Sequence, residues 1–534
     1  MKKIAASFLF VLGVTFVARA QVVSGEDIAV TNTYCGKVRG YISNDIYVYK
    51  GIPYAEADRF EAPHKPKSWT GIRNSLNWGP VAPLETPITS LANEEAEFLY
   101  EHDFGYASED CMRLNIWTPA INDGKKRPVM FWLHGGGYTV GSSQELPSYD
   151  GENIAKKGDV VLVTINHRLN ILGFLDLSAY GEKYKYSANL SILDIRFALE
   201  WVKNNIANFG GDPDNVTIFG QSGGGGKVNT LMAMPSAKRL FEKAINESGA
   251  FGSTLNDKSV TQAVGDQVLQ ILDIHPKNVD EIQKISFLEL VDAGRKALRI
   301  VGEKIRTQGG IGGRGLGWGP SVDGDLIPYQ INSDQALALS KDVPLMIGTV
   351  KNEFVTSLTV GLSNGTEQQV KEYIDKQWKD KAEAFIRAVK KAYPNDTKPS
   401  DLIDVDTRFR PGAIKQANQK SALSGGAPVY MYLFTWQSPS LGGKYKAWHC
   451  MELPFVFVNI DKCTHMTGGG PETYKLAEKM SQSWINFART GNPNAKGLPK
   501  WETYTEATGT TMIFDNKCEV KYKHDKELMD LVQQ

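Results

Sequence analysis

Short runs rich in Val, Ile and aromatic residues recur along the chain and constrain its fold more than any other feature. Runs of this kind occupy residues 128–134, 159–166, 215–219, 343–348 and 429–436. Near-continuous apolar runs are typical of strands that are buried on both faces of a mostly parallel sheet. Residues 192–205 and 476–488 instead carry apolar side chains at helical spacing, which indicates helices packed on a core. The alternation of strands and helices predicts an α/β fold.

Composition excludes several classes of protein. Apolar residues make up 42% of the 534 residues and charged residues 22%, which excludes a disordered or fibrous chain. The 60 Lys and Arg residues balance the 60 Asp and Glu residues, so we expect no nucleic-acid partner. Neither a repeat nor a Pro- or Ser-rich linker marks a domain boundary.

The first twenty residues have the pattern of a secretory signal peptide. Lys2 and Lys3 precede the apolar stretch 4–17, which is too short to span a bilayer comfortably, and Ala18-Arg19-Ala20 matches a cleavage site. An uncleaved anchor is the alternative, but nothing resembles a stop-transfer segment. We predict cleavage after Ala20 and an exported chain, periplasmic or secreted, that starts at Gln21. No later apolar stretch is long enough to suggest stable membrane insertion.

The cysteine pattern points to no metal site. No C-x-x-C occurs, so zinc is not expected, and we predict neither a metal nor a cofactor. Export permits disulfides, but the number of cysteines is odd, and two bridges with one free thiol can be arranged in fifteen ways. The five cysteines are Cys35, Cys111, Cys450, Cys463 and Cys518.

The pattern G-x-S-x-G, which surrounds the nucleophile of many serine hydrolases, occurs at 220–224 and at 361–365. Such a serine needs a strand before it, a helix after it and small neighbours. Ser222 follows the run 215–219 and precedes four glycines, whereas Ser363 lies in a polar context that favours an ordinary turn. We therefore predict Ser222 as the nucleophile.

A phosphate-binding loop is the rival interpretation of the glycine run. With Gly226-Lys227 in register with G-x-x-x-x-G-K-[ST], the first position is Gln221 and the last is Val228. Both positions depart from the pattern, so nucleotide binding is not favoured.

A serine nucleophile also needs N–H donors for the oxyanion. His134-Gly135-Gly136-Gly137 stands at the end of the run 128–134, one strand–helix unit before Ser222. Glycines allow main-chain N–H groups to approach the reacting carbonyl without an intervening side chain. We predict this segment as part of an oxyanion hole.

The acid and the base should follow the serine in that order. Glu353 comes just after the run 343–348, although a surface carboxylate would be its ordinary interpretation. His449 follows the run 429–436 across a glycine-containing loop. The other late histidines are His465, expected in another loop, and His524, in a charged tail. We predict Glu353 as the acid and His449 as the base.

With these motifs and several further segments, the chain resembles the type-B carboxylesterase/lipase family of cholinesterase-like α/β-hydrolases, most closely its bacterial para-nitrobenzyl-esterase-like members. The matching segments extend from about residue 34 to about residue 501. They include the residues at 51–55, 59–60, 108–119, 166–169, 173–175, 208–213, 322–324, 449–454 and 487–491.

The resemblance implies an α/β-hydrolase fold with a mostly parallel central sheet, helices on both faces and large insertions, formed by residues 21–534 as one domain. It implies Ser222, Glu353 and His449 as catalytic residues, as the local patterns also do. It assigns the oxyanion donors to Gly136, Gly137 and Gly223. The implied partner is a small-molecule ester, and the oligomeric state stays open.

The chain departs from the family pattern at several positions. Gln221 and Gly223 replace the Glu and Ala that often flank the serine. Many relatives bridge the cysteine at Cys111 to an upstream cysteine, but none follows Trp78-Gly79-Pro80 here, so that bridge is not expected. The loop 84–105 carries several acidic residues, which indicate a solvated face or, alternatively, a rim that favours cationic substrates. These are Glu85, Glu94, Glu95, Glu97, Glu101 and Asp103.

The predicted function is ester hydrolysis through an acyl-enzyme on a Ser-His-Glu triad. The alternatives are a lipase, polyesterase or amide hydrolase with the same triad, and a non-catalytic binding protein of the same fold. The expected neighbours of the substrate pocket are Tyr138, the segment 309–318 and Trp448.

Overall fold

The computed structural model describes residues 22–85, 102–103, 105–250, 254–307 and 315–533. The predicted signal peptide lies outside these ranges. The strands are β1 (Val22–Val23), β2 (Val30–Thr33), β3 (Gly36–Arg39), β4 (Tyr41–Ser43), β5 (Ile46–Pro53), β6 (Ile72–Asn74), β7 (Arg113–Thr118), β8 (Arg127–Leu133), β9 (Val161–Ile165), β10 (Gly211–Gln221), β11 (Lys243–Glu247), β12 (Asn256–Asp257), β13 (Ser321–Val322), β14 (Leu345–Val350), β15 (Val429–Phe434), β16 (Thr510–Phe514) and β17 (Glu519–Tyr522).

The α-helices begin and end as follows: α2 (Glu152–Gly158), α3 (Asn170–Phe174), α4 (Leu190–Asn205), α5 (Gly223–Met232), α6 (Lys258–Ile271), α7 (Phe287–Thr307), α8 (Asp334–Leu339), α9 (Thr356–Thr359), α10 (Glu367–Trp378), α11 (Ala382–Ala392), α12 (Arg410–Ser421), α13 (Leu453–Val456), α14 (Thr464–Thr467), α15 (Pro471–Thr490) and α16 (Lys526–Gln533).

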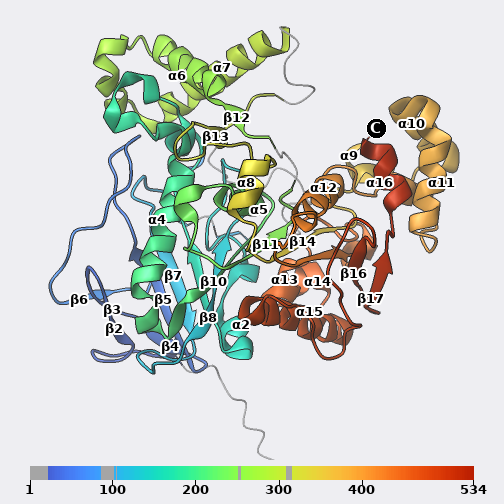
Figure 1. Ribbon diagram of the computed structural model, residues 1–534, viewed down its shortest axis with the longest axis horizontal. Coiled ribbons are helices and arrows are strands. Elements are labelled where there is room, and N and C mark those ends of the chain that lie inside the picture. Colours follow the sequence, from blue (N-terminus) through green and yellow to red (C-terminus); the bar gives the residue numbers. More distant parts are fainter. Residues whose placement is uncertain (1–21, 86–101, 104, 251–253, 308–314, 534) are drawn as a thin grey trace, which may run out of the picture.

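A twelve-stranded sheet organises the described residues (Figure 1), in the order β1-β4-β5-β7-β9-β8-β10-β11-β14-β15-β16-β17. The strands from β9 to β16 pair in parallel, and the flanking strands pair antiparallel. The five predicted apolar runs are β9, β8, β10, β14 and β15, at the centre of the sheet. This confirms the predicted α/β class and the mostly parallel sheet.

One central strand, β11, contains no apolar run from which the sequence could predict it. Its sequence is Lys-Ala-Ile-Asn-Glu, yet all five residues are buried. The polar side chains find partners inside the protein: Lys243 reaches the Asn215 side chain, Asn246 donates to Asn229, and Glu247 accepts from the Trp484 indole. Hydrogen bonds of this kind offset the cost of burying polar groups.

Alternating side chains of the central strands enter two hydrophobic cores. On β8, Val129, Phe131 and Leu133 join one core, whereas Met130 and Trp132 join the other. This alternation follows from the two-residue period of a strand. The predicted helices α4 and α15 are confirmed and lie on opposite faces: α4, α5 and α12 contribute to the first core, and α2, α13 and α15 to the second.

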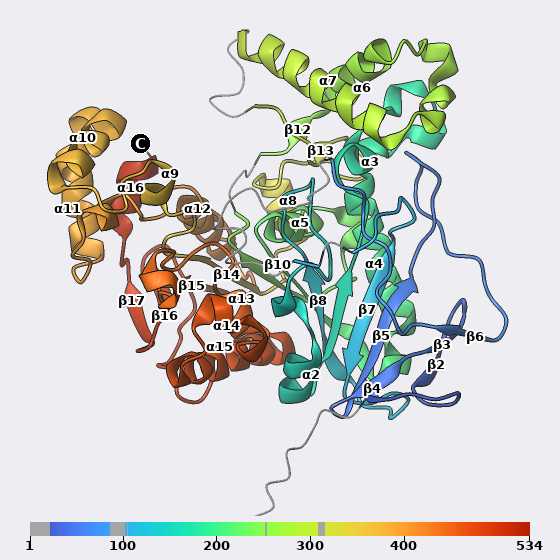
Figure 2. The same ribbon diagram turned by 180° about the vertical axis from the view of Figure 1, so that it is seen from behind.

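Two further groups of helices have cores of their own. Helices α3, α6 and α7 share one cluster, and α10, α11 and α16 share another. Figures 1 and 2 show α6 with α7, and α10 with α11, standing away from the sheet as separate projections. They correspond to the insertions expected around the central sheet.

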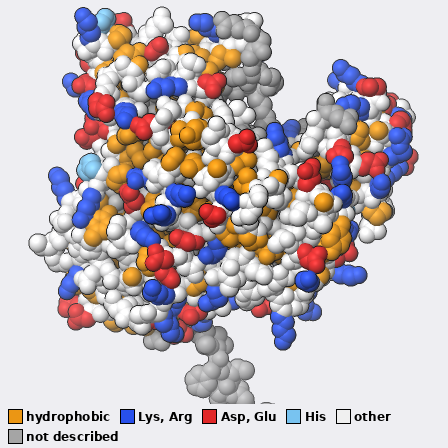
Figure 3. Space-filling model, in the orientation of Figure 1, with side chains coloured by type: hydrophobic (Ala, Val, Ile, Leu, Met, Phe, Trp, Pro, Cys, Tyr) orange, Lys and Arg blue, Asp and Glu red, His pale blue; other side chains and the backbone are white. Residues whose placement is uncertain are grey.

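The surface bears charges of both signs. Acidic and basic side chains intermingle on the face drawn in Figure 3, without a single-sign field. Searching the described residues for a helix long and apolar enough to cross a membrane finds none.

Candidate active site

Ser222 occupies a strained turn between β10 and α5. Its backbone has φ 55° and ψ −121°, a conformation that L-residues adopt only when the surroundings enforce it. The Ser222 N–H donates to the Glu247 carbonyl at 2.8 Å, and the Ser222 carbonyl accepts from Gly226 at 3.0 Å. The predicted strand–turn–helix context is therefore confirmed for Ser222. Ser363 lies in a turn between α9 and α10, also as expected.

The glycines around Ser222 permit main-chain contact with the end of β8. A Cβ on Gly224 would lie 2.0 Å from the Leu133 carbonyl oxygen, and one on Gly220 would lie 2.7 Å from the same atom. A Cβ on Gly223 would lie 2.2 Å from the carbonyl oxygen of Gly137. These distances exclude any side chain, so the glycine run serves close packing against the loop after β8.

That loop contains the predicted oxyanion donors. Gly136 and Gly137 have φ values of 78° and 64°, which favour glycine, and Gly136 accepts hydrogen bonds from Val140 and Thr139. Gly223 begins α5, whose N-terminus carries partial positive charge. The contact between Gly137 and Gly223 brings the two donor segments together beside Ser222.

Glu353 and His449 meet although 96 positions separate them in the chain. His449 Nδ1 hydrogen-bonds Glu353 Oε2, and the His449 N–H donates to the Glu353 carbonyl at 2.8 Å. The other carboxylate oxygen accepts from the Ser248 hydroxyl at 2.6 Å and the Val350 N–H at 3.2 Å. The carboxylate is thereby oriented toward the imidazole.

Burial shifts the pKa of both groups toward the neutral form. It lowers the pKa of His449 to about 4 and raises that of Glu353, while the hydrogen bonds from Ser248 and Val350 oppose the rise and favour the carboxylate. At neutral pH the imidazole is therefore unprotonated. A neutral imidazole is the form that accepts a proton from a hydroxyl.

Gln221 connects the turn at Ser222 to the imidazole. Its amide nitrogen lies 3.3 Å from Nδ1 and 3.2 Å from Nε2 of His449. Its amide oxygen accepts from the Cys450 thiol at 3.1 Å. Because Gln221 directly precedes Ser222, these contacts place the His449 loop against the serine turn.

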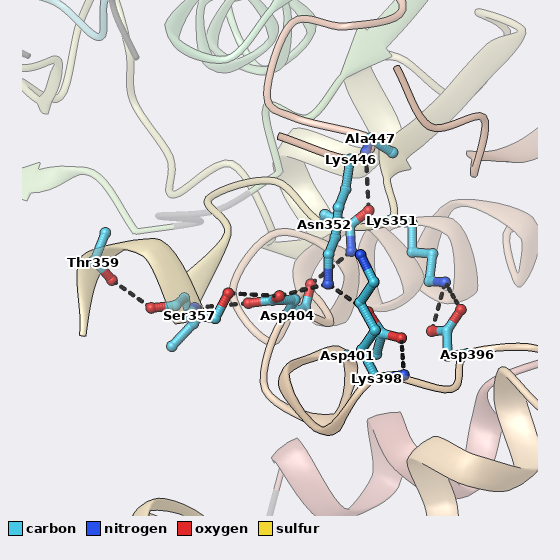
Figure 4. A network of polar contacts seen from close by, with 11 residues as sticks. Lys351, Asn352, Ser357, Thr359, Asp396, Lys398, Asp401, Asp404, Lys446 and Ala447 are labelled. Carbon is cyan, nitrogen blue, oxygen red and sulfur yellow. Dashed lines mark hydrogen bonds and ion pairs between the residues drawn. The ribbon is translucent and has the colours of Figure 1, made fainter. Parts of the chain in front are cut away.

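A buried polar network holds the segment that carries Glu353 (Figure 4). Asn352 accepts from the Ala447 N–H at 3.0 Å and donates to the Asp404 carbonyl at 2.9 Å. The Lys446 ammonium contacts the Asp404 carboxylate at 2.6 Å. The same carboxylate accepts from the Ser357 N–H and hydroxyl at 2.7 and 2.8 Å. The network thus joins the Glu353 turn, the 401–406 segment and the approach to His449.

Aromatic rings cover one side of the imidazole. The Phe354 ring lies 4.8 Å from the His449 ring, and the Phe409 ring lies 5.2 Å from it. Trp448 meets Phe354 edge-on at 5.5 Å. Phe354 is 41% exposed, so an apolar surface beside the base faces outward.

The comparison with protein-family models decides the family. The model of the carboxylesterase family matches residues 27–531. The chain belongs to the carboxylesterase family. It is a serine ester hydrolase with an α/β-hydrolase fold, and not a non-catalytic binding protein.

Named relatives agree with this assignment. The carboxylesterase is 35% identical to para-nitrobenzyl esterase of Bacillus subtilis (strain 168), over 93% of this chain and 96% of that protein. It is 31% identical to phenmedipham hydrolase of Pseudarthrobacter oxydans, over 89% and 92% of the two chains. A solved esterase from Clostridium hathewayi, described as able to hydrolyze aliphatic aromatic polyesters, superposes with a TM-score of 0.84 at 37% identity. That alignment covers 96% of this chain and 99% of the other.

Of the other residues considered in the sequence, His465 differs from its prediction and Cys111 agrees with it. His465 was expected in a loop but lies in α14, since residues 464–467 form a single helical turn. His524 packs edge-on against Tyr393, 5.1 Å away, in the C-terminal part of the carboxylesterase. Cys111 is a buried free thiol, as the missing upstream cysteine predicted.

Part of one expected pocket segment and part of the acidic loop lie outside the described residues. These are residues 309–314 and four of the six acidic residues of the loop: Glu94, Glu95, Glu97 and Glu101. Glu85, which is described, accepts from the Trp318 indole at 2.7 Å and pairs with Arg295. Asp103 accepts from the Gly105 N–H at 2.9 Å. A rim that favours cationic substrates therefore stays a prediction.

Sequence reasoning missed several residues around the site of this carboxylesterase. Ser248 directly follows β11, the strand that the sequence did not reveal. Asp404 and Lys446 are charged residues in loops, for which a solvated face is the ordinary interpretation. Only Lys227 left a signal, because a lysine within a run of glycine and apolar residues is unusual.

Proposed function

We propose that this carboxylesterase cleaves carboxylic esters through an acyl-enzyme formed on Ser222. His449 takes the Ser222 hydroxyl proton while Oγ bonds to the ester carbonyl carbon. Glu353 holds the imidazole through Nδ1–H and stabilises the imidazolium that forms. The N–H groups of Gly136, Gly137 and Gly223 bind the oxyanion of the tetrahedral intermediate.

The intermediate then collapses and the leaving alcohol departs. The bond between the carbonyl carbon and the alcohol oxygen breaks, and His449 gives its proton to that oxygen. Water enters next, loses a proton to His449 and attacks the acyl-serine, which releases the acid and regenerates Ser222. The sequence of steps balances without a metal or cofactor.

The contact between buried His449 and buried Glu353, beside the strained turn at Ser222, carries this proposal. The turn at Ser222 lies against the Gly137 loop, the imidazole is bonded to the Glu353 carboxylate, and Ser248 anchors that carboxylate. The membership in the carboxylesterase family supports the same chemistry.

Three variants of the mature chain test the mechanism on para-nitrophenyl butyrate. We expect Ser222→Ala and His449→Ala each to lower kcat by at least about a thousandfold. A fluorophosphonate should add its mass to wild type and not to Ser222→Ala. Ser363→Ala is the matched control, with wild-type kcat and labelling. Labelling or turnover that survives Ser222→Ala would refute the proposal.

The substrate class follows from the position of Phe354 and Phe409. His449 must reach the leaving oxygen, so side chains whose rings lie against the imidazole border the alcohol part of the ester. Phe354, the exposed ring of the two, favours flat, apolar alcohol groups by burial and ring stacking. We infer a preference for esters of aromatic alcohols over those of small aliphatic alcohols, on monomeric or polymeric substrates.

A substrate panel tests this preference. Benzyl and ethyl esters of one acid should differ in kcat/KM, and Phe354→Ala should reduce the difference about three- to tenfold. Tyr474→Ala removes an aromatic side chain of similar exposure on α15 and should leave the ratio unchanged. An unchanged ratio in Phe354→Ala would contradict the assignment of the alcohol side.

We also propose that the enzyme is exported after cleavage behind Ala20. The charged start, apolar stretch and Ala-Arg-Ala sequence support this. Fractionation of the producing cells should find the protein outside the cytoplasm, with Gln21 as its first residue. An intact N-terminus retained in the cytoplasm would refute export.

A further inference from the structure

Lys227 is a buried lysine close to the proposed oxyanion hole to which the mechanism assigns no role. It lies on α5, five residues after Ser222, and no part of it is exposed. A buried ammonium group is costly unless it is paired or hydrogen-bonded. Its contacts therefore indicate what it does.

The ammonium group donates to the main-chain carbonyl of His134 at 3.0 Å. This carbonyl belongs to the peptide that leads directly into Gly135, Gly136 and Gly137. Low polarity around a hydrogen bond strengthens it, and the Lys227 side chain can donate to this carbonyl as an ammonium or as a neutral amine. Lys227 thus ties α5 to the start of the oxyanion loop.

The glycine contacts place this hydrogen bond in a larger arrangement. The first turn of α5 already touches the same loop through Gly223 and Gly224, where no Cβ fits. Lys227 lies one turn further along the helix and holds the peptide between Leu133 and the donor glycines. Main-chain packing and one side chain therefore act on the same short segment.

The groups that face Lys227 are His134, His167, Glu145 and, beyond Glu145, Tyr149. The two imidazole rings stack 5.0 Å apart, and burial lowers the pKa of both well below the usual value, so both are neutral. Glu145 attracts the ammonium, and its carboxylate accepts from Tyr149 at 3.4 Å. Burial lowers the pKa of Lys227 to about 7 and raises that of Glu145 to about 7.

We propose that Lys227 is a positioning residue of the oxyanion hole, which holds the His134–Gly135 peptide so that the Gly136 and Gly137 N–H groups point at the developing oxyanion. The inference rests on the proposed function of those N–H groups. Pre-oriented donors stabilise the transition state without reorganisation during the reaction. Lys227 should thus affect the transition state more than the bound substrate.

Lys227→Met tests this, since methionine keeps much of the volume and removes the donor. With para-nitrophenyl butyrate we expect kcat to fall about ten- to a hundredfold, less than the loss of a whole donor, and KM to change less than about threefold. An aryl trifluoromethyl ketone, whose adduct with Ser222 carries an oxyanion, should lose affinity by the same factor as kcat/KM.

Lys420 supplies the matched control. It is a buried lysine on α12 whose ammonium also donates to main-chain carbonyls, those of Ser340 and Lys341 at 2.6 and 2.9 Å. Lys420→Met should lower the unfolding midpoint without changing kcat or the inhibitor affinity. Titration with a fluorophosphonate counts the active sites, so that kcat refers to folded enzyme alone.

The outcomes separate positioning from folding. Wild-type kcat per titrated site in Lys227→Met, or an unchanged inhibitor affinity, would overturn the proposal. Should Lys227→Met not fold, Lys227→Arg should stay within about threefold of wild type and Lys227→Gln about tenfold below it; equal activity of the two would overturn it. Failure of all three to fold would assign Lys227 to folding instead. Ser222→Ala tests the proposed function separately, because its result does not depend on Lys227.

Discussion

The segment around Ser222 and the segment around His449 are held in place by different means. Near Ser222, main chain packs on main chain, and the sites where Cβ atoms would lie are 2.0 to 2.7 Å from carbonyl oxygens at the end of β8 and in the loop after it. Near His449, side-chain contacts hold the segment in place. Glu353 accepts from Ser248, and Asn352 and Lys446 contact Asp404.

The difference follows from what each half of the site must place. Oxyanion donors are main-chain N–H groups, so the backbone itself has to approach the reacting atoms and side chains would interfere. A base and its acid are side-chain groups at the ends of rotatable bonds. Their orientation needs hydrogen-bond partners, and these come from several loops.

The largest effect should come from breaking the main-chain contact. In Gly224→Ala the new Cβ would clash with the Leu133 carbonyl, so β8 and α5 must separate. We expect a loss of stability of about 3 kcal/mol and a fall in kcat of at least about a hundredfold. Urea unfolding and turnover of a para-nitrophenyl ester measure the two effects.

Gly25→Ala is the control, because Gly25 is exposed and a Cβ there would meet only the Ile28 side chain, at 3.1 Å or more. It should match wild type in both measurements. A Gly224→Ala protein as stable and active as Gly25→Ala would show that the contact between the end of β8 and α5 is dispensable.

Breaking the side-chain network should have a smaller effect. Asp404→Asn leaves the buried Lys446 ammonium with Asp401 as its remaining carboxylate partner, at 2.5 Å. We expect a loss of about 2 to 3 kcal/mol in stability and about tenfold in kcat, because the Glu353 turn loses its anchor. Urea unfolding and kcat report the outcome.

Asp375→Asn removes a carboxylate from a solvent-exposed pair with Lys371 on α10. It should change stability by less than about 0.5 kcal/mol. If Asp404→Asn proved equally harmless, the network would not be the support of the acid–base pair.

The smallest effect concerns pH. Ser248→Ala removes the hydroxyl that donates to Glu353, so the pKa of that carboxyl, already raised by burial, should rise further. In the proposed mechanism Glu353 orients the base as a carboxylate, so the acid limb of kcat/KM should move to higher pH by about one unit. Profiles from pH 5 to 9 measure the limb. A limb that stays in place, or moves to lower pH, would contradict this role of Ser248.

Much of the fold could be predicted from the sequence because its signals are local. The five apolar runs predicted five of the six neighbouring strands from β9 to β15, since full burial on both faces demands apolar side chains. Strand β11 was not predicted because it contains polar residues, whose hydrogen-bond partners are distant in the chain, such as Trp484 for Glu247. The helical turn at His465 was not predicted because its four residues are too few to show a helical period of apolar side chains.

By itself, the sequence predicted five strands of the central sheet, two helices packed on it, the turn at Ser222 and the candidate residues Glu353 and His449. Each depends on neighbours within a few positions, or on motifs that the family shares. Only the tertiary structure decided that His449 hydrogen-bonds Glu353, that Lys446 pairs with Asp404 and that Lys227 donates to the His134 carbonyl. These hydrogen bonds join groups that are distant in the chain and that the fold brings together. The residues next to each group do not specify its distant partner.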